Sequence, residues 1–129
     1  MAYAPYNPPS SGGDNSHIYT CDSLVQVGSL VAIGPSSLLV LASSADLDGR
    51  TVGVVTEKPS QNQAKISQFY VLGNQTGIVP KQTYFLSTLS GTYSLNPPTS
   101  RDSITQIVGE GLSSTEIQIT IDPTKVRIN

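Results

Sequence analysis

The sequence has few residues that carry chemistry: among its 129 residues there is no tryptophan, one cysteine and one histidine. The single cysteine, Cys21, cannot form a disulfide within the chain, so stability has to come from the core and from subunit contacts. Nucleophilic catalysis needs a base beside the nucleophile, and His17 lies in a proline-rich segment rather than on a predicted scaffold element. We therefore predict a solvated or interface histidine, a small buried cysteine and no catalytic residue.

Charged residues are also scarce. They make up 12% of the chain, against roughly 25% in an average globular protein. The net charge is -2 and the seven Lys and Arg residues are scattered singly, so the basic patch of a nucleic-acid-binding protein is missing. No apolar run approaches the roughly 20 residues of a membrane span, and the first residues lack the basic start and hydrophobic stretch of an export signal. We expect neither nucleic acid nor a membrane as a partner.

Ligand sets for metals and cofactors are incomplete. His17 and Cys21 are four residues apart, which resembles half of a zinc site, but no second pair of His or Cys exists. Residues 46–49 (DLDG) resemble the start of a calcium loop, yet the later acidic ligand is missing, and we interpret them as an ordinary turn. No glycine pattern of a phosphate-binding or dinucleotide-binding loop occurs. We predict no metal and no cofactor.

Two other kinds of site stay open on the sequence alone. Spacing does not exclude a carboxylate pair for glycoside hydrolysis, but the acids concerned lie in or beside turns, where such residues are common for backbone reasons. They are Asp46, Asp48, Glu57, Asp102 and Asp122.

Sugar-binding β modules usually display exposed aromatic rings, and the candidates here are Tyr19, Tyr70, Tyr84 and Tyr93. Because tyrosine is equally common in strands and interfaces, we favour the core or a protein interface for them.

The first part of the chain differs in composition from the rest. Residues 1–21 are rich in Pro, Gly, Ser and Asn and have almost no aliphatic side chains, so we predict an extended N-terminal arm there and a β domain over residues 22–129. Ordering such a segment costs roughly 1–2 kcal/mol per residue, which a partner has to offset. Residues 1–20 would reach roughly 60–70 Å when extended, far enough to cross a neighbouring subunit. The predicted partner-binding anchors are Tyr3, Tyr6, Ile18 and Tyr19.

From Leu24 onward, short β-branched or aliphatic runs are separated by Gly, Pro, Asn and Asp. We predict eight strands, at residues 29–33, 38–41, 51–56, 65–72, 83–87, 92–95, 104–110 and 116–121. The alternation is cleanest in the last one, where Ile117, Ile119 and Ile121 would face the core. The pattern predicts an all-β fold, a small antiparallel β-sandwich or barrel of about eight short strands with an extended N-terminal arm.

Two of the predicted strands are apolar on both faces. Residues 38–41 (LLVL) and 52–55 (VGVV) suit either a central strand or a strand covered by a neighbouring subunit, and the second alternative would favour self-association. Gly53 and Gly109 each interrupt a strand that should be continuous. We predict β-bulges at these glycines.

Residues 77–87 read GIVPKQTYFLS, and Gly91, residues 95–98 (LNPP), residues 106–113 (QIVGEGLS) and Ile117 follow in that order. This succession resembles a small β domain of tailed-bacteriophage virion proteins, which recurs in head decoration, head-fibre and tail-fibre proteins. Upstream, residues 27–31 and 52–55 fit its opening, so the resemblance covers about residues 22–121. Lys81 departs from the family, which more often has glycine after the proline, and a different turn is expected there.

The resemblance implies a structural, non-enzymatic protein on the virion surface, made in the host cytoplasm and often a homotrimer. One role is a capsid decoration (cement) protein, with the major capsid protein as partner and the arm as a tie to it. The alternative is a head-fibre or tail-associated module that binds a receptor or a glycan. A chain of this size without a long repetitive shaft favours decoration.

Overall fold

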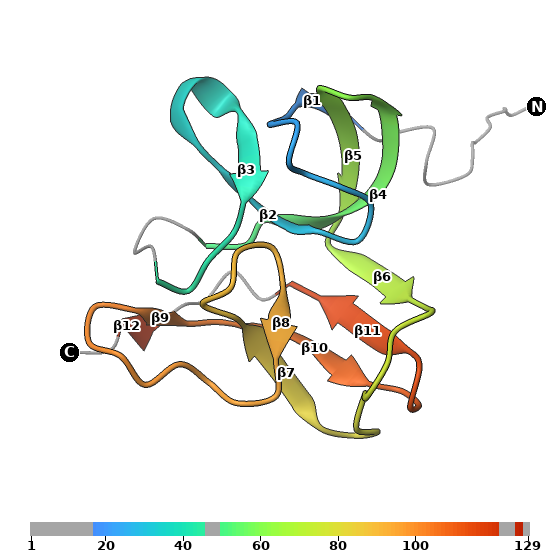
Figure 1. Cartoon of the computed structure of the whole chain (residues 1–129), viewed down its shortest axis with the longest axis vertical. Coiled ribbons are helices and arrows are strands. Elements are labelled where there is room, and N and C mark those ends of the chain that lie inside the picture. The colour runs from blue at the N-terminus through green and yellow to red at the C-terminus, as the bar shows by residue number, and fades with distance from the viewer. Residues whose placement is uncertain (1–16, 46–49, 122–125, 128–129) are drawn as a thin grey trace, which may run out of the picture.

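The computed structural model describes residues 17–45, 50–121 and 126–127 (Figure 1). In these residues, twelve strands form two five-stranded antiparallel sheets and one two-stranded ribbon, with a single short 3-10 turn, Pro35–Ser37. The predicted all-β antiparallel fold is confirmed. Each of the eight predicted strands overlaps an observed one, but the total exceeds eight because two of them are divided and two further strands lie outside them.

The first sheet curls into a small barrel (Figure 1). In spatial order its strands are β1 (Ile18–Thr20), β5 (Gln63–Ser67), β4 (Gly53–Ser60), β2 (Leu30–Ile33) and β3 (Leu39–Leu41). Its two edges meet because Cys21, just after β1, bridges to Leu39, and the Asp22 N–H donates to the Leu39 carbonyl at 2.9 Å. The barrel encloses its own apolar cluster of Cys21, Val25, Val31, Leu39, Val55 and Ala64.

The second sheet packs against the first across the main core. Its order is β6 (Phe69–Leu72), β11 (Ile117–Thr120), β10 (Ile107–Gly111), β7 (Thr83–Leu86) and β8 (Tyr93–Ser94), and beside it β9 (Ile104–Thr105) pairs with β12 (Val126–Arg127). Ile117 and Ile119 are fully buried, as the alternation predicts, and they join Leu86 of this sheet and Leu30 and Val54 of the first sheet in one cluster. The main core therefore lies between the two sheets.

Strand β4 is buried on both faces by this chain alone. Val54 belongs to the core between the sheets, and Val55 belongs to the core of the barrel. On β3, Leu39 lies in the barrel core while Val40 packs against the main core. The central-strand interpretation is therefore correct for β4, which lies between β5 and β2, but not for β3, which is the last strand in the order of the first sheet. Neither run needs a neighbouring subunit to cover it, because both pack against the two cores of this chain.

Two predicted strands are each divided at a glutamine. The run of residues 65–72 breaks at Gln68, so that β5 belongs to the first sheet and β6 to the second. The run of residues 104–110 breaks at Gln106, which separates the ribbon strand β9 from β10. Gln106 is buried, and its side-chain amide accepts from the Thr51 N–H at 2.7 Å and donates to the Thr51 carbonyl at 3.0 Å. This residue links the segment before β4 to the second sheet.

The bulge prediction holds at one of the two glycines. The pairing of β10 with β7 shifts register between Ile107 and Gly109, as a bulge at Gly109 requires. Gly53 pairs regularly with Val31, and the shifts on β4 lie further along, between Val55 and Ser60. Gly53 is closely surrounded instead: a Cβ there would lie 3.0 Å from Ile66 Cδ1 on the adjacent strand, so the Ile66 side chain would have to move slightly to accept it.

The predicted boundary of the arm at residue 21 is wrong. Ile18, Tyr19 and Thr20 pair with Lys65, Ala64 and Gln63 of β5, and the following Cys21 is buried in the barrel. These residues belong to the β domain because their backbone groups complete the first sheet and the Tyr19 ring packs on the barrel core. The predicted arm therefore cannot include residues 18–21. Tyr3 and Tyr6 lie outside the described residues.

This boundary leads to a prediction with two truncations. Removing residues 1–16 should leave the melting temperature within about 2 °C, since that segment has few groups suited to a core. Removing residues 1–20 also takes away β1 and the half-buried Tyr19, and should lower it by roughly 5–10 °C. Scanning calorimetry of the three chains makes the comparison. Equal melting temperatures for the two truncated chains would contradict a stabilising role for β1.

Candidate functional site

The outer face of the second sheet exposes apolar side chains. On β6, Tyr70 and Leu72 pack against the main core, so the alternating Phe69 and Val71 point outward, where they are 61% and 45% exposed. Ile107 on β10 is 44% exposed. Between them, β11 pairs Thr120 with Phe69 and Gln118 with Val71. We call this set of six residues the outer face: Phe69, Val71, Thr83, Ile107, Gln118 and Thr120.

A hollow of about 330 Å³ lies in the outer face, lined by Thr83, Ile107, Gly109, Glu110, Gln118 and Thr120. Gly109 in its lining has no room for a side chain, because a Cβ there would lie 2.5 Å from the Gln118 carbonyl oxygen. Of the described residues that line it, only Glu110 is ionisable. A recess with apolar, amide and hydroxyl groups beside exposed aliphatic side chains is typical of a protein-binding surface.

The predicted anchors Ile18 and Tyr19 lie on opposite faces of β1, as neighbouring strand residues must. Ile18 is 44% exposed, whereas Tyr19 is half-buried and contacts His17 edge-to-face at a ring distance of 4.6 Å. Tyr19 also lines a second hollow, of about 470 Å³, with His17, Ile33, Val52, Ile66, Ser67 and Gln68. His17 is exposed and Cys21 is buried, as predicted, so the two do not share a site.

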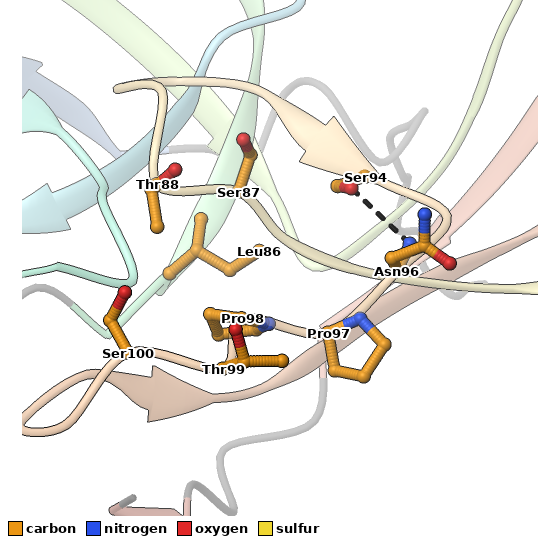
Figure 2. Close-up of a pocket in the computed structure, with 9 residues that line it drawn as sticks. All are labelled: Leu86, Ser87, Thr88, Ser94, Asn96, Pro97, Pro98, Thr99 and Ser100. Carbon is orange, nitrogen blue, oxygen red and sulfur yellow. Dashed lines mark hydrogen bonds between the residues drawn. The ribbon is translucent and has the colours of Figure 1, made fainter.

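A third hollow, of about 260 Å³, lies among the loops around β7 and β8 (Figure 2). We call it the loop pocket, and it is lined by Leu86, Ser87, Thr88, Ser94, Asn96, Pro97, Pro98, Thr99 and Ser100. Figure 2 shows these side chains arranged around Leu86, with a hydrogen bond from the Asn96 N–H to Ser94 Oγ at 3.2 Å. Among the described residues, no ionisable side chain lines this pocket.

The tyrosines considered as sugar platforms have other surroundings. Tyr84 is buried, and it accepts a hydrogen bond from the Val79 N–H at 2.9 Å. Tyr70 and Tyr93 pack against the main core. Burial raises the pKa of Tyr93 above its ordinary value, with Tyr84 as the second cause, so its hydroxyl stays protonated and donates to Gln75 Oε1. These three rings are therefore part of the main core or pack against it.

Acidic and metal-ligating residues are dispersed over the part of the chain that the structure describes. They form no group of three or more His, Cys, Asp or Glu side chains that could hold a metal ion. Glu57 faces Lys65 at 3.6 Å across β4 and β5. Asp46, Asp48 and Asp122 lie outside the described residues. No helix in the described ranges has the length and hydropathy of a membrane span.

Sequence reasoning did not identify the outer face. Residues 69–72 read FYVL, so both faces of β6 are apolar, and alternation alone does not tell which face meets the core. The same holds for Ile107, which follows the break at Gln106. Comparisons with protein-family models, with curated proteins and with solved structures found no match.

Proposed function

We propose that this chain is a structural, non-enzymatic virion protein of a tailed bacteriophage, a capsid decoration (cement) protein that attaches to the major capsid protein. The observation that carries the proposal is the outer face, where Phe69, Val71 and Ile107 are exposed around a hollow with a single carboxylate. Exposed apolar groups of this kind are normally covered by a protein partner. The low charge of the chain also suits a surface that docks onto protein rather than onto nucleic acid.

The resemblance to phage virion domains supports the same role. The residues that carry it most densely, 77–117, include β7, β8, β10 and the start of β11, so they build most of the sheet that presents the outer face. Lys81, where the family more often has glycine, has a φ of 68°. Glycine adopts this left-handed conformation without steric cost, so the backbone here suits the residue of the family. The substitution at Lys81 therefore does not imply a different turn.

Attachment through two contacts fits the chain. The outer face supplies apolar area, and the proposed arm, whose sequence precedes Ile18, supplies Tyr3 and Tyr6 as further anchors. Two linked contacts bind more tightly than either alone because the second forms at a high effective concentration. In this proposal the protein is made in the host cytoplasm and ends on the virion surface.

The homotrimer is proposed from the resemblance alone. The doubly apolar runs at β3 and β4 no longer argue for it, since both are covered within the chain. The outer face offers an apolar surface for such contacts as well as for the capsid. Light scattering at micromolar concentration measures the mass of the free protein.

The second candidate function is a head-fibre or tail-associated module that binds a receptor or a glycan. The loop pocket favours it, because a recess lined by hydroxyl and carboxamide groups without charge suits a polyhydroxylated ligand. Electron microscopy of whole particles separates the two roles, since decoration requires density for the chain over the capsid shell.

A matched pair of variants tests attachment. Phe69→Lys should reduce binding of the purified protein to particles that lack it by at least about tenfold, because it places a charge where an apolar side chain is buried on docking. Leu24→Lys is the control: Leu24 is equally exposed, at 68%, but lies between β1 and β2, away from the outer face. Co-sedimentation with particles gives both affinities. Equal loss in the two variants would contradict the outer face as the attachment surface.

A further inference from the structure

The walls of the loop pocket are held by hydrogen bonds within the loops. Ser87 Oγ accepts from the Leu89 N–H at 3.0 Å, and Ser94 Oγ accepts from the Asn96 N–H at 3.2 Å. At the far end, the Ser103 N–H donates to the Ser100 carbonyl at 3.3 Å. Pro97 and Pro98 between these points have fixed φ angles. A pocket held in this way is formed before any ligand arrives, which lowers the entropic cost of binding.

Four polar side chains of the pocket remain available. The hydroxyls of Thr88, Thr99 and Ser100 and the carboxamide of Asn96 make no hydrogen bond to any of the described residues. Hydroxyl and amide groups both donate and accept, so together they can pair with a ligand that does the same. The hydroxyl groups of a sugar have this property.

The charge and the size of the pocket restrict the kind of ligand that it can bind. No Lys, Arg, His, Asp or Glu is among the described residues that line it, so none of these residues would compensate the lost hydration of an ionised ligand. Its volume of about 260 Å³ is slightly below that of most small-molecule sites, which begin at roughly 300 Å³, so the ligand has to be small. The half-buried ring of Pro98, beside Leu86 in Figure 2, adds an apolar surface that could meet the C–H face of a sugar ring.

We propose that the loop pocket binds one neutral monosaccharide unit, the terminal sugar of an uncharged glycan. Asn96 and Ser100 hydrogen-bond its hydroxyl groups from opposite sides of the pocket, and Pro98 contacts its ring. The inference goes beyond capsid attachment and does not depend on it, since none of the described residues that line the pocket belongs to the outer face. It also names the binding site that the second candidate function, a glycan-binding module, would use.

Amide NMR spectra of the full chain, titrated with single sugars, test the proposal. The probes are the methyl glycosides of glucose, galactose and mannose, and N-acetylglucosamine, with glycerol as a small polyol and N-acetylneuraminic acid as a charged sugar. At least one neutral sugar should shift the amide signals of Thr88, Asn96, Thr99 and Ser100 in a saturable way, with a dissociation constant of about 1–10 mM. Glycerol should give no saturation, because it has too few groups to span the pocket.

Variants test whether the changes in the amide signals come from binding in the loop pocket. The double substitution Asn96→Ala with Ser100→Ala should weaken binding about fivefold or more, and Ser114→Ala, which removes an exposed hydroxyl from the turn between β10 and β11, should leave it unchanged. The spectra themselves show that each variant is folded. The proposal is overturned if no neutral sugar saturates, if the double variant binds as well as the original chain, or if N-acetylneuraminic acid binds more tightly than every neutral sugar.

Discussion

Gly111→Ala is expected to lower the melting temperature by more than about 10 °C or to prevent folding. A Cβ at Gly111 would overlap the carbonyl oxygen of Val79 and lie 3.0 Å from Ile78 Cγ2. The backbone cannot move away easily, because the Gly111 N–H donates to the Gln82 carbonyl at 3.0 Å and its carbonyl accepts from the Lys81 N–H at 2.8 Å. Relief of the overlap would break the contacts that hold residues 78–82 against β10.

Gly73→Ala is the matched control for this prediction. A Cβ at Gly73 would meet nothing within 4 Å, and its φ lies outside the left-handed region, so the melting temperature should change by less than about 2 °C. Thermal unfolding followed by circular dichroism compares the two variants. A melting temperature for Gly111→Ala within about 3 °C of the original chain would show that Val79 does not approach β10 so closely.

Gln106→Leu is expected to reduce the free energy of unfolding by about 2–5 kcal/mol. Leucine nearly conserves the volume of the side chain, so little cavity is formed. The substitution does remove the side-chain amide that bonds the backbone of Thr51. The N–H and the carbonyl group of Thr51, which is buried, would then both lack a hydrogen-bond partner. Each such group costs about 1–3 kcal/mol.

Urea unfolding measures this loss, and Gln82→Leu provides the reference. Gln82 is exposed beside β7, so its replacement should change the free energy of unfolding by no more than about 0.5 kcal/mol. If the two leucine variants were equally stable, the Gln106 amide would not be a structural link between Thr51 and the second sheet. A loss confined to Gln106→Leu would show that this buried amide stabilises the contact between the two halves of the molecule.

The sequence by itself determined the fold class and most of the strand positions. Alternation at residues 116–121 placed Ile117 and Ile119 in the core correctly, because a strand with one buried face shows its period directly. Turn residues such as Gly91, which has a φ of 80°, marked the ends of strands since few other residues adopt that backbone. The bulge at Gly109 was likewise visible as a glycine inside an apolar run.

The tertiary structure decided which strands share a sheet and which faces stay exposed. A period of two shows the faces of a strand but not the sheet to which it belongs, so the breaks at Gln68 and Gln106 were invisible. Residues 18–20 are a strand rather than an arm because they pair with residues 63–65 of β5, which are far away in the sequence. The bridge between Cys21 and Leu39 then brings the two edges of the barrel together. Where both faces of a strand are apolar, as in β6, only packing against the other sheet determines that Phe69 is left at the surface.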